Sequence, residues 1–185
     1  MQPTLTGERL LVRPIREADR REMFAAASDP QIWALHPSPD RYREPVFRAY
    51  FDAAIASGSA FAFVDRHTGE IVGSSRYHGA DPERSEIEIG WTFLVRRCWG
   101  GDWNLDAKRL MLGHAFRWFD TVVFWVGAGN QRSRRAMEKI GGVLRDGTFR
   151  REAGGDHPCV VFEIRKRDWR IETVPARAAG QAGPT

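Results

Sequence analysis

The sequence predicts a single mixed α/β domain, and three observations lead to this fold class. Apolar residues recur with strand and helix periods in the order strand, two helices, three strands, helix, strand, helix, two strands. The three consecutive strands favour antiparallel neighbours, whereas the later strand–helix–strand units favour some parallel pairing, so the sheet should be mixed. A chain of 185 residues, 42% of them hydrophobic, can bury one core without disulfides or metal.

The N-terminal part of the chain is expected to hold one strand and two helices. An apolar strand at residues 10–15 precedes a helix at residues 18–28, which should end before Pro30. The proline-containing residues 29–44 predict a loop. Pro45 suits the first turn of a second helix, whose apolar residues recur at three- and four-residue spacing up to Gly58.

The middle of the chain is expected to hold three strands. Residues 60–65 and 70–77 are joined by Arg66–Gly69, which has hairpin length and a turn glycine. In the third strand, at residues 85–95, an unbroken alternation would place Glu86 and Glu88 on one face. Gly90, in the middle of this strand, indicates a bulge.

The C-terminal part is expected to close a sheet of seven strands flanked by about four helices. The expected elements are a helix at 104–120, a doubly covered strand at 122–126, a helix at 130–140, and strands at 143–149 and 159–165. The domain should therefore span residues 1–170. Residues 171–185, rich in Ala, Gly and Pro, predict a disordered tail.

Charge and composition narrow the class of partner and the cellular compartment. The formal net charge is +4, but acidic residues are interleaved with the arginines, and no basic block reaches five residues. A mildly basic surface or an anionic small ligand is favoured over a nucleic acid. The sequence has neither a basic leader before an apolar stretch nor an apolar run of about 18 residues, so we expect a cytoplasmic protein without a membrane span.

The segment from Val95 to Asn104 is the most informative part of the chain, because it places glycines between a strand and a helix start. Backbone N–H groups can converge on an anion there, and the helix dipole favours a phosphate. The segment is neither a Walker loop nor the three-glycine dinucleotide fingerprint. The alternative is an ordinary glycine turn into a helix.

Four segments in the right order give the chain a family resemblance. They are Thr6–Pro14 with Asp19, Arg97-x-x-Gly100-x-Asp102, Asn130–Ser133 leading to Lys139–Gly142, and Ile164–Trp169. Together they resemble GNAT-superfamily N-acetyltransferases, in particular the Rim-type branch of ribosomal-protein N-terminal acetyltransferases, over about residues 4–170. Two departures are visible: Asp102 replaces a small residue of the glycine loop, and Gly142 replaces a phenylalanine.

The resemblance implies a sheet splayed between the strands at 85–95 and 122–126, with acetyl-CoA as acetyl donor in the opening and no metal. Pantetheine would pair with the backbone of one strand, and the pyrophosphate would meet the glycine loop and the turn into the helix. The residues implied in donor binding are Phe93, Leu94, Val95, Arg96, Arg97, Trp99, Gly100, Gly101, Asp102, Asn104, Asn130 and Ser133.

The resemblance also implies a general base, because a protonated amine cannot attack a thioester. Glu88 aligns with the glutamate that fills this role in several family members, and Glu86 on the same face competes with it. Either residue could instead be a half-exposed strand carboxylate. His36 and His78 fall near expected acceptor segments, although a lone histidine is more often structural.

The leaving-group step is expected to lack its usual acid. Many family members place a tyrosine in the helix after the asparagine signature, and Met137 stands at that position here. Ser133, one turn earlier, could donate a hydrogen bond to the departing sulfur. An acyl-cysteine at Cys98 is disfavoured, because the family transfers the acetyl group directly.

The sequence thus predicts an N-acetyltransferase acting by direct attack in a ternary complex, with a protein or peptide N-terminal amine as leading acceptor. A small-molecule amine, such as an amino acid, a polyamine or an antibiotic, is the first alternative. A non-catalytic acyl-CoA sensor and a basic nucleic-acid-binding protein are the others. A homodimer is compatible with the resemblance.

Overall fold

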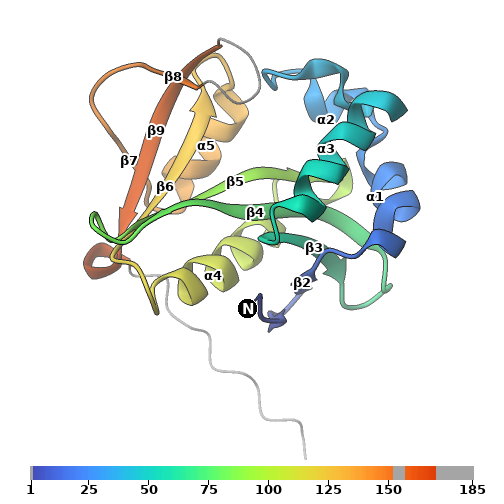
Figure 1. Ribbon diagram of the computed structural model, residues 1–185, viewed down its shortest axis with the longest axis horizontal. Coiled ribbons are helices and arrows are strands. Elements are labelled where there is room, and N and C mark those ends of the chain that lie inside the picture. The colour runs from blue at the N-terminus through green and yellow to red at the C-terminus, as the bar shows by residue number, and fades with distance from the viewer. Residues whose placement is uncertain (1, 152–156, 170–185) are drawn as a thin grey trace, which may run out of the picture.

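A computed structural model of the chain describes residues 2–151 and 157–169 (Figure 1). The predicted C-terminal tail lies outside the described residues. A central mixed sheet is covered by one group of helices on each of its two faces (Figure 1).

Within the described residues, nine strands form one sheet in the order β1-β2-β3-β4-β5-β6-β9-β7, with β8 also paired to β9. The strands are β1 (Leu5–Thr6), β2 (Leu10–Pro14), β3 (Ala60–Asp65), β4 (Ile71–Asp81), β5 (Glu86–Leu94), β6 (Thr121–Gly127), β7 (Val143–Leu144), β8 (Phe149–Arg151) and β9 (His157–Arg165). Neighbouring strands are antiparallel except β5 and β6, which are parallel. The predicted mixed, mostly antiparallel sheet is confirmed.

Five α-helices pack on this sheet in the described part of the chain. They are α1 (Arg20–Ala27), α2 (Pro30–Trp33), α3 (Glu44–Ala56), α4 (Trp103–Ala115) and α5 (Gln131–Lys139). One buried cluster lies between the sheet and α1, α2 and α3, and a second lies between the sheet and α4 and α5. The sheet therefore carries a core on both faces.

Two sequence expectations are corrected. Residues 29–44 are not a plain loop, because they contain α2 and a 3₁₀ turn at Pro39–Tyr42. The side chain of Asp29 caps α2 by accepting the Gln31 N–H at 2.9 Å, and a proline occupies the first turn. The single strand expected at 143–149 is divided into β7 and β8, which pair with different parts of β9 and raise the strand count from seven to nine.

The predicted bulge in β5 is present, but it lies one residue after Gly90. Gly90 still pairs with Arg76 of β4, the register shifts before Phe93, and Trp91 has a positive φ of 52°. The bulge resets the strand's alternation, so that Ile89 lies in the core under α4 while Phe93 lies in the core under α1–α3. Thr92 consequently meets α4 through Lys108.

The opening motif of the chain proves to be part of the framework. Asp106 of α4 accepts hydrogen bonds from the backbone N–H groups of Glu8, Arg9 and Leu10 at 2.9–3.3 Å. A Cβ at Gly7 would overlap the Asp106 carboxylate, so any larger residue here would displace the group that accepts these hydrogen bonds. The turn before β2 is thereby tied to the start of α4.

Candidate active site

A cavity of about 470 Å³ opens where β5 and β6 part. The two parallel strands are paired only from Glu86 to Glu88 on β5 and from Thr121 to Val123 on β6. Beyond this point both strands line the cavity, together with α2, the segment before α3, and the N-terminal turns of α4 and α5. The splay implied by the resemblance is thus present, between the expected strands.

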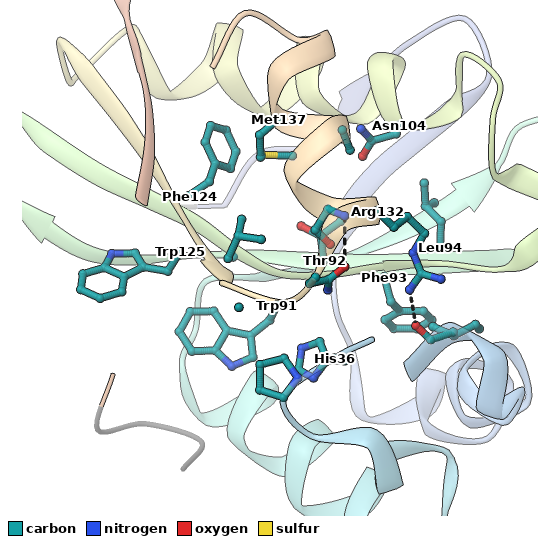
Figure 2. Close-up of a pocket in the computed structure, with 18 of the residues that line it drawn as sticks. His36, Trp91, Thr92, Phe93, Leu94, Asn104, Phe124, Trp125, Arg132 and Met137 are labelled. Atoms are coloured by element: carbon teal, nitrogen blue, oxygen red, sulfur yellow. Dashed lines mark hydrogen bonds between the residues drawn. The ribbon is translucent and has the colours of Figure 1, made fainter. Parts of the chain in front are cut away.

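Two ends of the cavity can be distinguished in Figure 2. Phe124 and Met137 lie at one end, and His36 and Trp91 lie at the other. Two helix N-termini border the cavity, because Asn104 in the first turn of α4 and Ser133 in the first turn of α5 both line it. Helix N-termini present unpaired N–H groups and a positive dipole, which suit phosphate oxygens.

The residues expected to bind the donor divide into two groups. Those that line the cavity are Phe93, Leu94, Trp99, Gly100, Asn104, Asn130 and Ser133. Those that do not line it are Val95, Arg96, Arg97, Gly101 and Asp102. Of the second group, Val95 packs against both cores, so the structure does not bring its side chain to the cavity.

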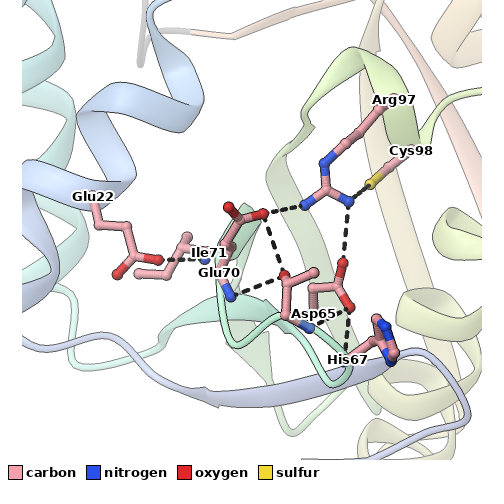
Figure 3. Close-up of polar contacts among 8 residues, drawn as sticks. Glu22, Asp65, His67, Glu70, Ile71, Arg97 and Cys98 are labelled. Atoms are coloured by element: carbon pink, nitrogen blue, oxygen red, sulfur yellow. Dashed lines mark hydrogen bonds and ion pairs between the residues drawn. The ribbon is translucent and has the colours of Figure 1, made fainter.

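The guanidinium groups of Arg96 and Arg97 are paired within the chain. Arg97 contacts Asp65 at 3.1 Å and Glu70 at 2.8 Å, across the β3–β4 hairpin (Figure 3). Arg96 forms an ion pair with Asp29, the residue that caps α2. These arginines hold the glycine loop against the rest of the fold.

Gly100 and Trp99 set the path of the loop. Gly100 has φ +73°, a conformation that other residues rarely adopt, and a Cβ there would meet no neighbouring atom. The Trp99 indole N–H donates to the Leu94 carbonyl at 2.9 Å, and the Arg132 guanidinium stacks 4.0 Å above the Trp99 ring. Asn130 caps α5 by accepting the Ser133 N–H at 3.1 Å.

The two candidate bases have different surroundings. Glu86 forms an ion pair with Arg145, which also pairs with Glu163 on β9. Glu88 is 4% exposed and lies next to Gly90, which lines the cavity. A Cβ on Gly90 would come within 2.5 Å of Glu88 Oε1, so the carboxylate lies beside the cavity-lining Gly90, although Glu88 itself does not line the cavity. Glu88 is therefore the better placed of the two.

Lys108 is a cavity residue that sequence reasoning missed. It projects from α4, is 1% exposed, and donates a hydrogen bond from Nζ to Thr92 Oγ1 at 3.0 Å. Its ammonium also lies 5.1 Å from the centre of the Phe124 ring. Burial lowers the pKa of Lys108 from 10.5 to about 7. The sequence places Lys108 off the polar stripe of this helix, which runs through Asp106, Arg109 and Arg117, and this position was the available signal.

The end of the cavity near His36 is cationic and aromatic. Arg41, Arg76 and Trp91 line it, and the Arg76 guanidinium stacks 3.5 Å above the Trp91 ring. Burial, with Arg41 nearby, lowers the pKa of His36 from 6.5 to about 3, so its imidazole is neutral near pH 7. His78 does not line the cavity but contacts the edge of Trp91.

In the described part of the chain, two of the three sulfur-containing residues that line the cavity, Cys98 and Met137, are poor proton-transfer groups. Cys98 is 1% exposed, and burial raises the pKa of its thiol, which disfavours the nucleophilic thiolate. Met137 also lines the cavity, and its thioether has no proton to donate. Among residues 2–151 and 157–169, no cluster of histidine, cysteine and acidic side chains could hold a metal ion.

Comparison with known proteins gives the family. The acetyltransferase (GNAT) domain model matches residues 9–143, which is more than half of the chain. The fold and the splayed cavity define an acetyltransferase of this class, and the chain belongs to the GNAT family. No helix in the described part of the chain is both long and apolar enough to cross a membrane.

Three solved structures illustrate the likeness. A GCN5-related N-acetyltransferase from Brucella melitensis has a TM-score of 0.80 at 22% identity, over 91% of this chain and 81% of that one. An acetyltransferase from Agrobacterium tumefaciens has a TM-score of 0.70 at 25% identity, over 90% and 96%. A candidate ribosomal-protein-serine acetyltransferase from Vibrio cholerae has a TM-score of 0.70 at 16% identity, over 89% and 99%.

Proposed function

We propose that the protein transfers the acetyl group of acetyl-CoA to a primary amine. The observation that carries this proposal is the parting of β5 and β6 around a cavity bordered by two helix N-termini. The exposed edges of the parted strands offer backbone groups to an extended chain such as pantetheine. The glycine loop and the first turn of α4 offer N–H groups to the pyrophosphate.

The chemistry that acetyl-CoA supplies is an activated thioester. During transfer the amine nitrogen forms a bond to the carbonyl carbon, the carbon–sulfur bond breaks, and the amine gives up a proton. We assign the acceptance of that proton to Glu88, directly or through water beside Gly90. Lys108 and Ser133 are two hydrogen-bond donors of the cavity wall that we assign to the departing thiolate.

The charge of the cavity supports catalysis in a second way. Arg41, Arg76 and Arg132 line it, and within the described residues no aspartate or glutamate does. A positive environment lowers the pKa of a bound amine, because a like charge disfavours its ammonium form. The neutral amine is the nucleophile, so the cavity would raise the reactive fraction at neutral pH.

The leading acceptor remains a protein or peptide N-terminal amine, with a small amine as the alternative. A CoA-release assay with acetyl-CoA and a panel of N-terminal peptides, free amino acids, polyamines and aminoglycosides tests the proposal. We expect release that depends on one acceptor class and yields its acetylated product. Tight acetyl-CoA binding by calorimetry without turnover on any acceptor would instead support the acyl-CoA sensor.

A further inference from the structure

Arg41 is a buried cation whose surroundings do not balance its charge. It lies in the 3₁₀ turn before α3, is 9% exposed, and lines the cavity. Its guanidinium packs 5.0 Å from the Trp33 ring centre and 4.7 Å from the Tyr50 ring centre. No ion pair joins Arg41 to an acidic side chain among residues 2–151 and 157–169.

The polar neighbour of Arg41 is a poor partner for a cation. Arg41 Nη1 lies 3.3 Å from His36 Nε2, while His36 Nδ1 accepts the Ser38 N–H. A neutral imidazole has one acceptor nitrogen, and Nδ1 fills that role, so Nε2 carries the hydrogen and cannot accept from Arg41. The Trp33 and Tyr50 rings beside the guanidinium supply no carboxylate, and Arg41 lines the cavity.

A buried arginine without a carboxylate lowers the stability of the folded protein, because the free energy lost on desolvating its charge is offset mainly by pairing with a group of opposite charge. Arg76 adds to this cost, since it lines the same cavity as a second cation and helps to lower the pKa of Arg41, after burial itself. Neighbouring exposed arginines behave differently. Arg43, two residues on, reaches Asp40 at 3.6 Å outside the cavity.

From this geometry we propose that the amine acceptor carries a carboxylate a few bonds from its nitrogen, and that Arg41 binds this carboxylate. The inference rests on the proposed acetyl transfer and deepens it by naming the acceptor class. Two sources have this chemistry: a free amino acid through its α-carboxylate, and a peptide whose first residues are acidic. Polyamines and aminoglycosides are disfavoured, because they bring more positive charge into a cationic cavity.

The test compares acceptors that differ only in the carboxylate. Each amino acid is assayed beside its α-amide and its decarboxylated amine. C-terminally amidated tetrapeptides beginning with Asp or Glu are assayed beside those beginning with Asn or Gln. We expect kcat/KM for CoA release to be at least tenfold higher for the carboxylate member, in one of the two series. The series that responds identifies the source of the carboxylate.

Variants of Arg41 separate binding from folding. Arg41→Gln and Arg41→Met should raise the KM of the carboxylate acceptors, so that the kcat/KM ratio between acceptors with and without the carboxylate falls to about one. The acetyl-CoA Kd should stay within twofold of wild type. Arg41→Lys should keep part of this kcat/KM ratio. Arg43→Gln is the matched control and should behave as wild type. Melting temperatures establish that each variant is folded.

Three outcomes distinguish failure of the inference from failure of the proposed function. Turnover that is equal for both members of every pair would overturn the inference and leave acetyl transfer standing. An equal loss on all acceptors in the Arg41 variants would also overturn it, as a purely structural role. If no acceptor is turned over, calorimetry with the amino acids and acidic peptides decides: Arg41-dependent binding supports the carboxylate site, and its absence refutes it.

Discussion

Replacing Lys108 by methionine should stabilise the protein at neutral pH. The side chain is buried between Thr92 and Phe124 with no acidic partner among the ion pairs of the described residues. Methionine has a similar length and keeps the packing of the stem while removing the charge. The Thr92 hydroxyl retains Ser75 Oγ at 2.8 Å, so the substitution leaves it a hydrogen-bond partner.

The size of the effect follows from the altered pKa. Lowering the pKa of Lys108 from 10.5 to about 7 corresponds to a cost of roughly 4 kcal/mol of folding free energy at pH 7. Loss of the hydrogen bond to Thr92 and of the contact with Phe124 offsets about 1 kcal/mol each. The net gain is about 2 kcal/mol, which raises the melting temperature by roughly 4–8 °C for a chain of this length.

The pH dependence of this gain is the sharper test. Between pH 7 and pH 10.5 the unfolded chain holds the Lys108 proton and the folded chain does not, so the stability of the wild type rises with pH over this window. The advantage of Lys108→Met should therefore shrink by about 3 kcal/mol between pH 7 and pH 9.5. Urea unfolding at both pH values measures it, with the exposed Lys139→Met as control. An advantage that is absent, or independent of pH, would refute the reasoning.

Further predictions concern turnover and donor binding. Glu88→Gln should lower kcat for CoA release about 10²-fold or more with acetyl-CoA affinity kept, and equal turnover would exclude it as the base. Gly90→Ala should reproduce this loss, since a Cβ would displace the Glu88 carboxylate; wild-type turnover would contradict that explanation. Gly100→Val should weaken acetyl-CoA binding at least tenfold in calorimetry, because the position requires positive φ, and an unchanged Kd would remove this loop from the site. Ser133→Ala should cost no more than about tenfold in kcat, whereas a thousandfold loss would identify an essential acid.

Features encoded by neighbouring residues could be predicted from the sequence. The bulge after Gly90, the hairpin turn at Gly69, and the cap formed by Asn130 each depend on a few consecutive residues, and all three are present. The cavity-lining position of Gly100 followed from the glycine pattern before α4, whereas that of Leu94 followed only from the family resemblance. The division of 143–149 into two strands was not predictable, because it depends on which parts of β9 accept each piece.

The parts of the site that depend on distant contacts were missed or misjudged. Arg97 sits beside the glycine loop in sequence, but its partners Asp65 and Glu70 come from a hairpin about thirty residues away. Lys108 becomes unusual only when Thr92 and the rest of β5 cover it. Arg41 belongs to a segment that was expected to be a loop, so its burial could not be foreseen.

The Asp106 carboxylate links the turn before β2 to α4, a helix that lines the cavity. The same helix that receives the three N–H groups of residues 8–10 carries Asn104 and Lys108 on its cavity side. Disturbance of the N-terminal turn would therefore tilt or loosen the helix that holds these groups, although neither Gly7 nor Asp106 lines the cavity. If a change in the N-terminal turn lowers activity, the cause would accordingly be a shift of the cavity-lining residues of α4, transmitted through the Asp106 carboxylate.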